Sequence, residues 1–295
     1  MPNLQVLLNG LVSGAGFALV GAAFAFLLLT TRTLSVSLGA LYVLAPYGVL
    51  TGLRLGAPLP VSVLGSVTTA ALAAIICEVL IHWPLERRNA SAEAHLIGSL
   101  GAYLAIVQIG VLLWGPDRLV LNGGLPLVYA LGGIRITQPQ LLGFVCSVTA
   151  SCVFVATIQR TRLGLGLRAL GSNPLLLSTL GRNVQAYRIV AFGAAGALVG
   201  LAACLAAYDV GFDPNVGLGA VLIGFASAIL GGVSSLWGPI MAGVAIGILR
   251  AFVGWMFGTE WVDAGTFTVL ALALIGLPRG LSGGIGRGRS LEAEP

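Results

Sequence analysis

Hydrophobic residues occupy this chain in long runs that are separated by short polar segments. Nine runs carry at most one charged residue each, and most approach the about 20 residues that an α-helix needs to cross a bilayer. They cover residues 4–29, 36–53, 59–82, 95–114, 139–158, 189–208, 217–232, 239–257 and 262–277. This pattern predicts an all-α, polytopic helical membrane protein.

The number of spans depends on the last third of the chain. The run 217–232 is short, and the helix-breaking pairs Gly231-Gly232 and Gly238-Pro239 separate it from the next run. Broken helices are tolerated at membrane depth where they face protein or a cavity. Three full crossings, or one crossing plus a re-entrant pair, both fit this region. We therefore expect eight or nine transmembrane helices with broken or re-entrant segments.

The composition indicates a single transmembrane domain over residues 1–295. Of the 295 residues, 57% are hydrophobic and 8% are charged, and the mean hydropathy is +1.00. Soluble domains contain about 25% charged residues, so this chain cannot cover a water-exposed surface. It is also too apolar to be disordered. Within the domain we expect a cytoplasmic loop over 159–188 and a polar C-terminal tail over 282–295.

The charged and metal-binding residue types exclude several chemistries. The chain has no Lys, which a standard P-loop uses to bind phosphates, so ATP and Mg²⁺ are expected on another subunit. The two His and four Cys show no metal-ligand spacing. We expect no catalytic residue, metal or cofactor on this chain, and no enzymatic activity. The net charge of +5 comes from Arg at the ends of apolar runs, which indicates membrane orientation and not nucleic-acid binding.

The arginines predict which side faces the cytoplasm. Placing residues 83–94 and 159–188 inside leaves Arg54, Arg118 and Arg135 outside and eleven arginines inside. Cytoplasmic loops carry an excess of Arg and Lys. The C-terminus is therefore expected in the cytoplasm and the N-terminus in the periplasm. Arg250 falls within a run, where we expect it to face protein or the transport route and not lipid.

The loop 159–188 contains the signals of a short helix. Asn173 suits the N-cap, Pro174 the first helical position and Gly181 the residue beyond the end, which predicts a helix over 174–180. Leu176 and Leu180 would be exposed on it. A helix of two turns is not stable alone in water. It would either dock on a partner or lie in the lipid headgroups.

Polar and small residues within the apolar runs are candidates for a substrate route. Transporters place substrate sites at broken helices, although most such residues simply bond across helices. The candidates are Ser35, Ser37, Gly39, Tyr42, Tyr103, Gln108, Gly231 and Gly232. Glu78, near a predicted helix end, is expected to be a paired end group more than an ion relay.

Several stretches resemble one known family in order and spacing. They are Glu78 with Pro84-Leu85-Glu86-Arg87-Arg88, Leu113-Trp114-Gly115-Pro116-Asp117, Arg160-Thr161-Arg162-Leu163-Gly164, Leu180-Gly181-Arg182-Asn183-Val184, and Leu230-Gly231-Gly232 with Gly238. They are similar to the membrane permease subunit of bacterial branched-chain amino acid ABC importers, the Liv-type family. The resemblance runs from Leu8 to Leu281 and implies an ABC importer permease fold in the bacterial inner membrane.

The resemblance also implies partners and a coupling helix. Such permeases pair with a second permease subunit, identical or paralogous, receive substrate from an extracytoplasmic binding protein, and contact a cytoplasmic ABC ATPase dimer through a short helix. The ATPase-coupling residues implied here are Arg168, Asn173, Pro174, Leu176, Leu177, Leu180, Gly181 and Arg182. This favours docking of the segment 174–180 over a position in the headgroups.

The chain departs from the family pattern at two places. Ser35-Val36-Ser37-Leu38-Gly39 lacks the usual Asn and His, and Leu175-Leu176-Leu177 replaces the usual Glu-Ala-Ala that opens the coupling helix. The expected substrate is a branched-chain or other hydrophobic amino acid, while urea, a short amide or a sugar remain open. An ion-coupled secondary transporter is disfavoured, because the acidic residues lie near predicted membrane faces or in tails.

Overall fold

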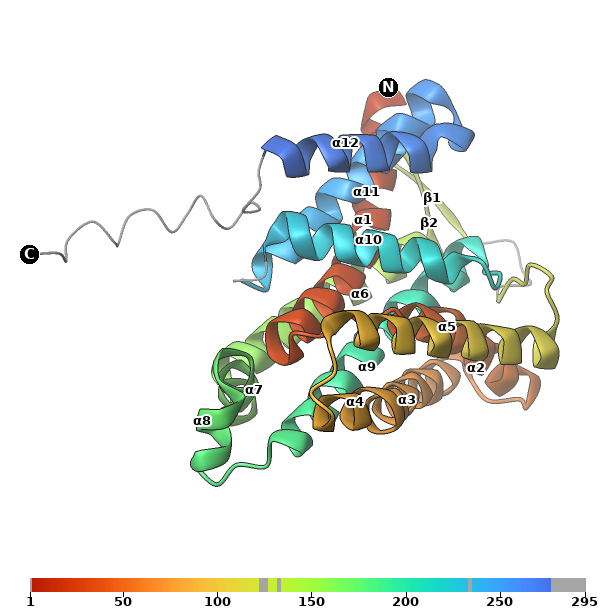
Figure 1. Cartoon of the computed structure of the whole chain (residues 1–295). Helices are drawn as coiled ribbons and strands as arrows, with labels where there is room; N and C mark the ends of the chain where they lie inside the picture. Colours follow the sequence, from red (N-terminus) through yellow and green to blue (C-terminus); the bar gives the residue numbers. More distant parts are fainter. Residues whose placement is uncertain (1, 122–126, 132–133, 233–234, 277–295) are drawn as a thin grey trace, which may run out of the picture.

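A computed structural model describes residues 2–121, 127–131, 134–232 and 235–276, and every predicted apolar run is helical in it (Figure 1). The tail 282–295 lies outside these residues. The helices that correspond to the runs are α1 (Pro2–Thr31), α2 (Ser37–Arg54), α3 (Leu59–Cys77) continued by the π-helix η1 (Glu78–His82), α5 (Ala92–Trp114), α6 (Gln138–Arg160), α9 (Val184–Val210), α10 (Val216–Gly231), α11 (Trp237–Phe257) and α12 (Val262–Gly276). The prediction of eight to nine membrane helices agrees with this set.

Six of the described helices are long and apolar enough to cross a membrane, and α10 is a shorter apolar helix. The remaining elements are α4 (Trp83–Arg87), the strands β1 (Val128–Leu131) and β2 (Ile134–Thr137), α7 (Arg162–Ser172), α8 (Pro174–Thr179) and the 3-10 turn η2 (Thr259–Trp261). We call the end of the molecule that carries α7, α8 and the last residue of α1 the α8 end. The strands and the start of α1 lie at the opposite end, where Gln5 bonds the backbone of Arg135.

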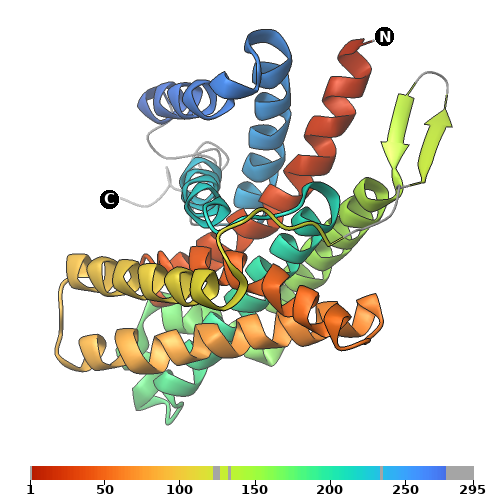
Figure 2. The ribbon, with the colours of Figure 1, turned by 90° about the vertical axis from the view of Figure 1, so that its right-hand side faces the viewer.

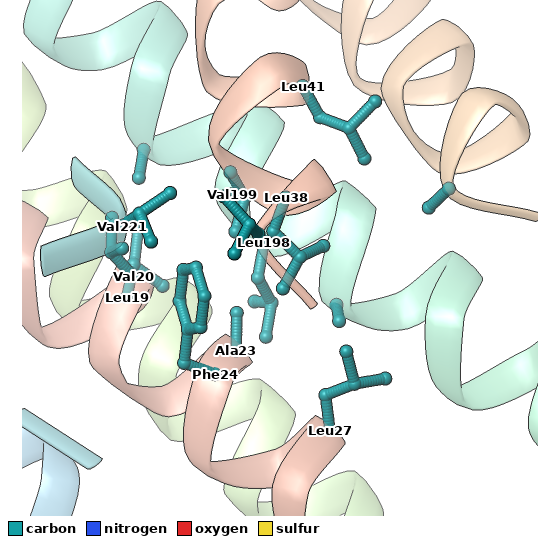
Figure 3. Packing of buried hydrophobic residues seen from close by; sticks show 14 of the residues in the cluster. Leu19, Val20, Ala23, Phe24, Leu27, Leu38, Leu41, Leu198, Val199 and Val221 are labelled. Carbon is teal, nitrogen blue, oxygen red and sulfur yellow. The ribbon is translucent and has the colours of Figure 1, made fainter. Parts of the chain in front are cut away.

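Helix α1 forms the centre of the fold. It packs mainly against α11 and also contacts α9, α10 and α6. Leu19 and Phe24 of α1 meet α2, α9 and α10 in the largest buried hydrophobic cluster, in which Leu38, Val199 and Val221 point toward them (Figure 3). Helices α3 and α5 lie further out, and Figure 2 shows them running in opposite directions. More of their surface is exposed and available to lipid.

Glycines set the distance between α1 and α11. A Cβ on Gly243 would lie 2.6 Å from the Cα of Ala18, and one on Gly10 would lie 2.7 Å from the Cα of Ile248. A Cβ on Gly247 would collide with Gly14. Lipid provides no hydrophobic drive between helices, so small residues that let backbones touch supply the packing. The residue pairs also show that the two helices run antiparallel.

Contacts with α1 also show how far the helices α10 and α11 extend toward the α8 end. Gly21 of α1 packs against Ser227 near the end of α10 and against Pro239 at the start of α11. Gly21 lies ten residues before Thr31, which is about 15 Å along the helix axis. The described ends of α10 and α11 therefore stop well short of the α8 end. Helix α11 is nevertheless long and apolar enough to cross a membrane, whereas α10 is a shorter apolar helix.

Among the elements that the sequence did not predict, a hairpin and a helix are the largest. The first is the antiparallel hairpin β1–β2, in which Tyr129 pairs with Ile136; the Gly-Gly pair between its alternating segments is a hairpin signal that the all-α pattern concealed. The second is α7, whose glycine content disguised an amphipathic helix. Its buried face consists of Gly164, Leu167, Leu170 and Gly171, and the glycines allow close contact with the ends of α6 and α1.

The contact between α1 and α11 gives a stability prediction. Gly247→Leu places a side chain where the backbone of Gly14 lies, so we expect a loss of about 3 kcal/mol of unfolding free energy, or failure to fold. Thermal unfolding in detergent measures this loss. Gly65→Leu is the matched control, because a Cβ on Gly65 would meet nothing within 4 Å. Equal stability of the two variants would contradict the backbone contact.

Candidate functional site

Helix α8 confirms the short helix predicted in the loop 159–188. The side chain of Asn173 accepts a hydrogen bond from the backbone N–H of Leu176 at 3.0 Å, which caps the N-terminus. At the other end Gly181 adopts φ +72°, a conformation that glycine tolerates best. The N–H groups of Gly181 and Arg182 donate to the carbonyls of Ser178 and Leu177. Both ends are therefore terminated by local bonds, as the sequence indicated.

The leucines of α8 divide into one anchor and an exposed group. Leu177 is 5% exposed, whereas Leu176 is 58%, Leu175 is 74% and Leu180 is 71% exposed. The sequence assigned Leu177 to the coupling contact, but its burial makes it the residue that holds α8 against the protein. The exposed leucines remain available to a partner or to lipid headgroups.

Basic residues flank this exposed apolar surface. Arg168 on α7 and Arg182 after α8 are both exposed. The guanidinium of Arg168 donates to the carbonyls of Gly164 and Gln159, both at 3.4 Å, and so ties α7 to the end of α6. The α7–α8 segment thus combines exposed leucines with exposed positive charge. A surface of this kind suits a partner protein with apolar and acidic groups.

A cavity of about 670 Å³ lies between α1, α2, α9, α10, α11 and α12. Its walls are mostly apolar, with Phe17 and Val20 from α1, Ala203 and Ala207 from α9, and Ile223 from α10. Of the eight residues predicted for the substrate route, Tyr42 lines this cavity. Tyr42 and Phe17 also line a smaller cavity of about 150 Å³ beside α6.

Charged groups of both signs reach the large cavity. Arg250 Nη1 lies 2.8 Å from Asp263 Oδ1, an ion pair whose angles are not those of a hydrogen bond. The guanidinium carbon of Arg250 is also 5.7 Å from the ring centroid of Phe17. Arg118 and Asp213 line the same cavity. The expectation that Arg250 faces protein or a route agrees with this position.

The other predicted route residues lie elsewhere. Ser35 and Ser37 bond each other at 2.8 Å in a buried polar cluster. Gly39 and Tyr103 lie where α2 and α5 cross α10, and a Cβ on Gly39 would collide with Val221. Gly231 packs against the backbone of Gly238 and Pro239, next to Gly232 at the end of α10. Gln108 is exposed on α5. Their role in transport stays a prediction.

A buried ion-pair network was missed by the sequence. Glu78 is 0% exposed, and its carboxylate accepts hydrogen bonds from Arg188 Nε at 2.6 Å and Nη2 at 3.5 Å. Arg188 Nη1 also lies 3.2 Å from Glu86 Oε2. The sequence indicated a paired Glu78 but not its partner, because no local spacing relates residues 110 positions apart. The pair joins the end of α3 to the first turns of α9.

The two histidines extend this network toward α2. His82 Nδ1 lies 3.1 Å from His95 Nδ1, so one of the two donates, and His82 Nε2 lies 3.2 Å from Ser35 Oγ. His95 Nε2 is 3.7 Å from Glu86 Oε2. Among the residues that the structure describes, no group of three or more His, Cys, Asp or Glu could hold a metal ion. The histidines therefore act here as links between helices.

Comparisons with known proteins give one consistent family. Residues 6–277 match the family described as the branched-chain amino acid transport system permease component. The chain is 26% identical to the high-affinity branched-chain amino acid transport system permease protein BraD of Pseudomonas aeruginosa, over 95% of each chain. It is 24% identical to the corresponding permease protein LivH of Escherichia coli K12, again over 95% of each chain.

Two further similarities are to an import permease with another named substrate and to a solved structure. The chain is 31% identical to the autoinducer 2 import system permease protein LsrC of Escherichia coli, over 84% of this chain and 68% of that protein. Among solved structures, PsaBC from Streptococcus pneumoniae in complex with Fab matches with a TM-score of 0.52 and 16% identity, over 93% of this chain and 91% of that chain. At this identity the structural match supports the fold alone.

The buried ion pair predicts non-additive stability effects. Arg188→Leu leaves Glu78 buried without its cation, so we expect a loss of about 3–5 kcal/mol of unfolding free energy. Glu78→Leu should cost less, because Arg188 keeps Glu86. The double variant should recover most of the loss. Thermal unfolding of the three variants in detergent measures the coupling, and additive losses would show that the two side chains do not depend on each other.

Proposed function

We propose that this chain, which belongs to the branched-chain amino acid transport permease family, forms the translocation route of an ATP-binding cassette importer for a branched-chain or similar hydrophobic amino acid. One observation supports this proposal above the others. A single chain of this family contains both an apolar cavity with charges of both signs and a capped helix with exposed leucines. The cavity would accept the solute, and the helix would contact the ATPase and respond to its ATP-driven conformational change.

The cavity supports a substrate that is both zwitterionic and apolar. Arg250 can pair with a carboxylate and Asp263 with an ammonium group, while Phe17, Val20 and Ile223 offer apolar contacts to a side chain. The side chain of Arg250 is 21% exposed and that of Asp263 is 74% exposed, so the carboxylate is accessible to an ammonium group that arrives from solution. The similarity to LsrC favours a second candidate, a solute of another class such as the autoinducer 2 named for that relative.

The source of energy is proposed to lie on partner subunits. The chain has no Lys for a P-loop, so ATP and Mg²⁺ would bind a cytoplasmic ATPase dimer that contacts Leu175, Leu176 and Leu180. A second permease subunit, identical or paralogous, would complete the route, and a binding protein would deliver solute at the opposite face. An ion-coupled secondary mechanism has less support, because Glu78, a fully buried carboxylate, is already paired with Arg188.

We further propose that the protein lies in the bacterial inner membrane with the α8 end in the cytoplasm and the N-terminus in the periplasm. The distribution of charge supports this orientation. Eight of the arginines predicted inside lie on the elements of the α8 end: Arg32, Arg87, Arg88, Arg160, Arg162, Arg168, Arg182 and Arg188. At the opposite end Arg135 bonds Gln5, and Arg118 donates to the carbonyl of Val210.

Docking of the ATPase on α8 has a direct test. The double variant Leu176→Asp and Leu180→Asp puts charge on two exposed leucines without touching the buried anchor Leu177. We expect the affinity for the ATPase to fall by more than about tenfold, since residues central to an interface contribute about 2 kcal/mol or more each. Co-purification of the ATPase with the permease measures it, and an unchanged elution profile shows that the permease remains folded.

A matched control separates docking from a general effect of charge. Leu55→Asp introduces the same change at a leucine that is 82% exposed in the turn after α2, away from the α8 end. It should leave co-purification intact. If the α8 variant also retains the ATPase, α8 is not the docking helix, and a position in the lipid headgroups becomes the better interpretation.

A further inference from the structure

Arg32 connects the segment between α1 and α2, residues 32–36, to the last turn of α7. Its guanidinium donates from Nε to the carbonyl of Gly171 at 3.1 Å and from Nη2 to the carbonyl of Ser172 at 3.3 Å. These residues end α7 and directly precede Asn173, the N-cap of α8. Carbonyls in the last turn of a helix lack partners within the helix and carry partial negative charge. A cation at this point therefore holds the end of α7.

The backbone at this contact is close and constrained. A Cβ on Gly171 would collide with the carbonyl oxygen of Leu29, so the end of α7 touches the end of α1. Arg32 itself adopts φ +53°, a left-handed conformation that residues other than glycine disfavour. Such conformations persist where the surrounding contacts determine them, and they concentrate at functional sites. The backbone N–H of Arg32 donates to the carbonyl of Leu28 at 3.1 Å, which ends α1, and the bonds to α7 hold the side chain.

The other end of the same linker is fixed to different helices. Ser35 Oγ lies 3.2 Å from His82 Nε2 of η1, and the N–H of Val36 donates to Ser99 Oγ of α5 at 3.1 Å. His82 in turn contacts His95, whose Nε2 lies 3.7 Å from Glu86, the second partner of Arg188. The linker is thus held at its start by α7 and at its end by α3 and α5.

Helix α2 begins directly after the linker and leads into the cavity. Ser37 is its first residue, and Tyr42 lines both the large and the small cavity. Helix α2 is buried along most of its length, so a displacement of its first turn would be transmitted by a packed helix and not by a flexible loop. A displacement of α8 by a docked partner has a short physical path through α7, Arg32 and the linker to the wall of the cavity.

We propose that Arg32 is a positioning residue that transmits movement of the α7–α8 segment to α2 and so couples ATP hydrolysis to opening of the cavity. This rests on the proposed function, because it requires an ATPase docked on α8. It assigns Arg32 a role that differs from docking: the side chain faces α7 within the same chain. Removing the side chain should leave the docking surface in place while breaking the connection between that surface and the route.

The test uses the reconstituted permease–ATPase complex and compares uptake with ATP hydrolysis. Arg32→Asn removes the reach of the side chain, and Asn tolerates the left-handed conformation better than most residues. We expect normal ATPase co-purification and normal ATP hydrolysis, with uptake per ATP reduced by about tenfold, which is within the range of allosteric coupling. Arg32→Lys, which keeps the charge but not the planar fork, should be intermediate. Arg32→Gly serves as a second variant if Arg32→Asn fails to fold, because glycine adopts this conformation freely.

A control variant at another arginine of the α8 end tests whether the effect is specific to Arg32. Arg88→Ala removes an arginine from the α4–α5 turn, also at the α8 end, and should leave uptake per ATP unchanged. Wild-type uptake per ATP in Arg32→Asn would overturn the proposal, as would loss of ATPase binding, which would make Arg32 a docking residue. A wild-type permease that binds no ATPase would instead overturn the proposed function, so the two failures are distinguishable.

Discussion

The close approach of α1 and α11 through glycine is the constraint on which the other features of this structure depend. Lipid offers the helices no hydrophobic reason to associate, so the fold relies on backbone contacts such as Gly243 against Ala18. This contact fixes the depth of the α10–α11 hairpin beside Gly21. It also places Phe17 and Val20 of α1 in the wall of the cavity, so the shape of the proposed route follows from helix packing.

Helix α1 joins the two regions that the proposed function requires, the cavity and the docking surface. Its middle, at Phe17 and Val20, lines the cavity, and its last turn touches α7 at Gly171. At this end the buried charges of Glu78 and Arg188 are bonded to each other within the protein, as a low-dielectric environment demands. An importer must keep the docking surface and the route separate but mechanically connected. The linker after α1, residues 32–36, is bonded to α7 at its start and to η1 and α5 at its end.

The sequence predicted the helices well because membrane helices follow from hydrophobic run length alone. The short helix α8 was also predictable, since Asn173, Pro174 and Gly181 act locally. Helix α7 was hidden by glycines whose purpose is tertiary contact, and the β1–β2 hairpin by its small size. The partner of Glu78 and the contacts of Arg32 depend on how helices distant in the sequence meet, which no local spacing encodes. For the same reason only Tyr42, among the predicted route residues, could be placed at the large cavity.

We infer that this chain moves solute with energy from a separate ATPase. The most direct measurement is uptake of a labelled branched-chain amino acid into liposomes that contain the permease complex with its ATPase and binding protein. We expect uptake that requires ATP hydrolysis and continues when proton and sodium gradients are collapsed. Uptake driven by an ion gradient in liposomes that contain this chain alone would contradict it.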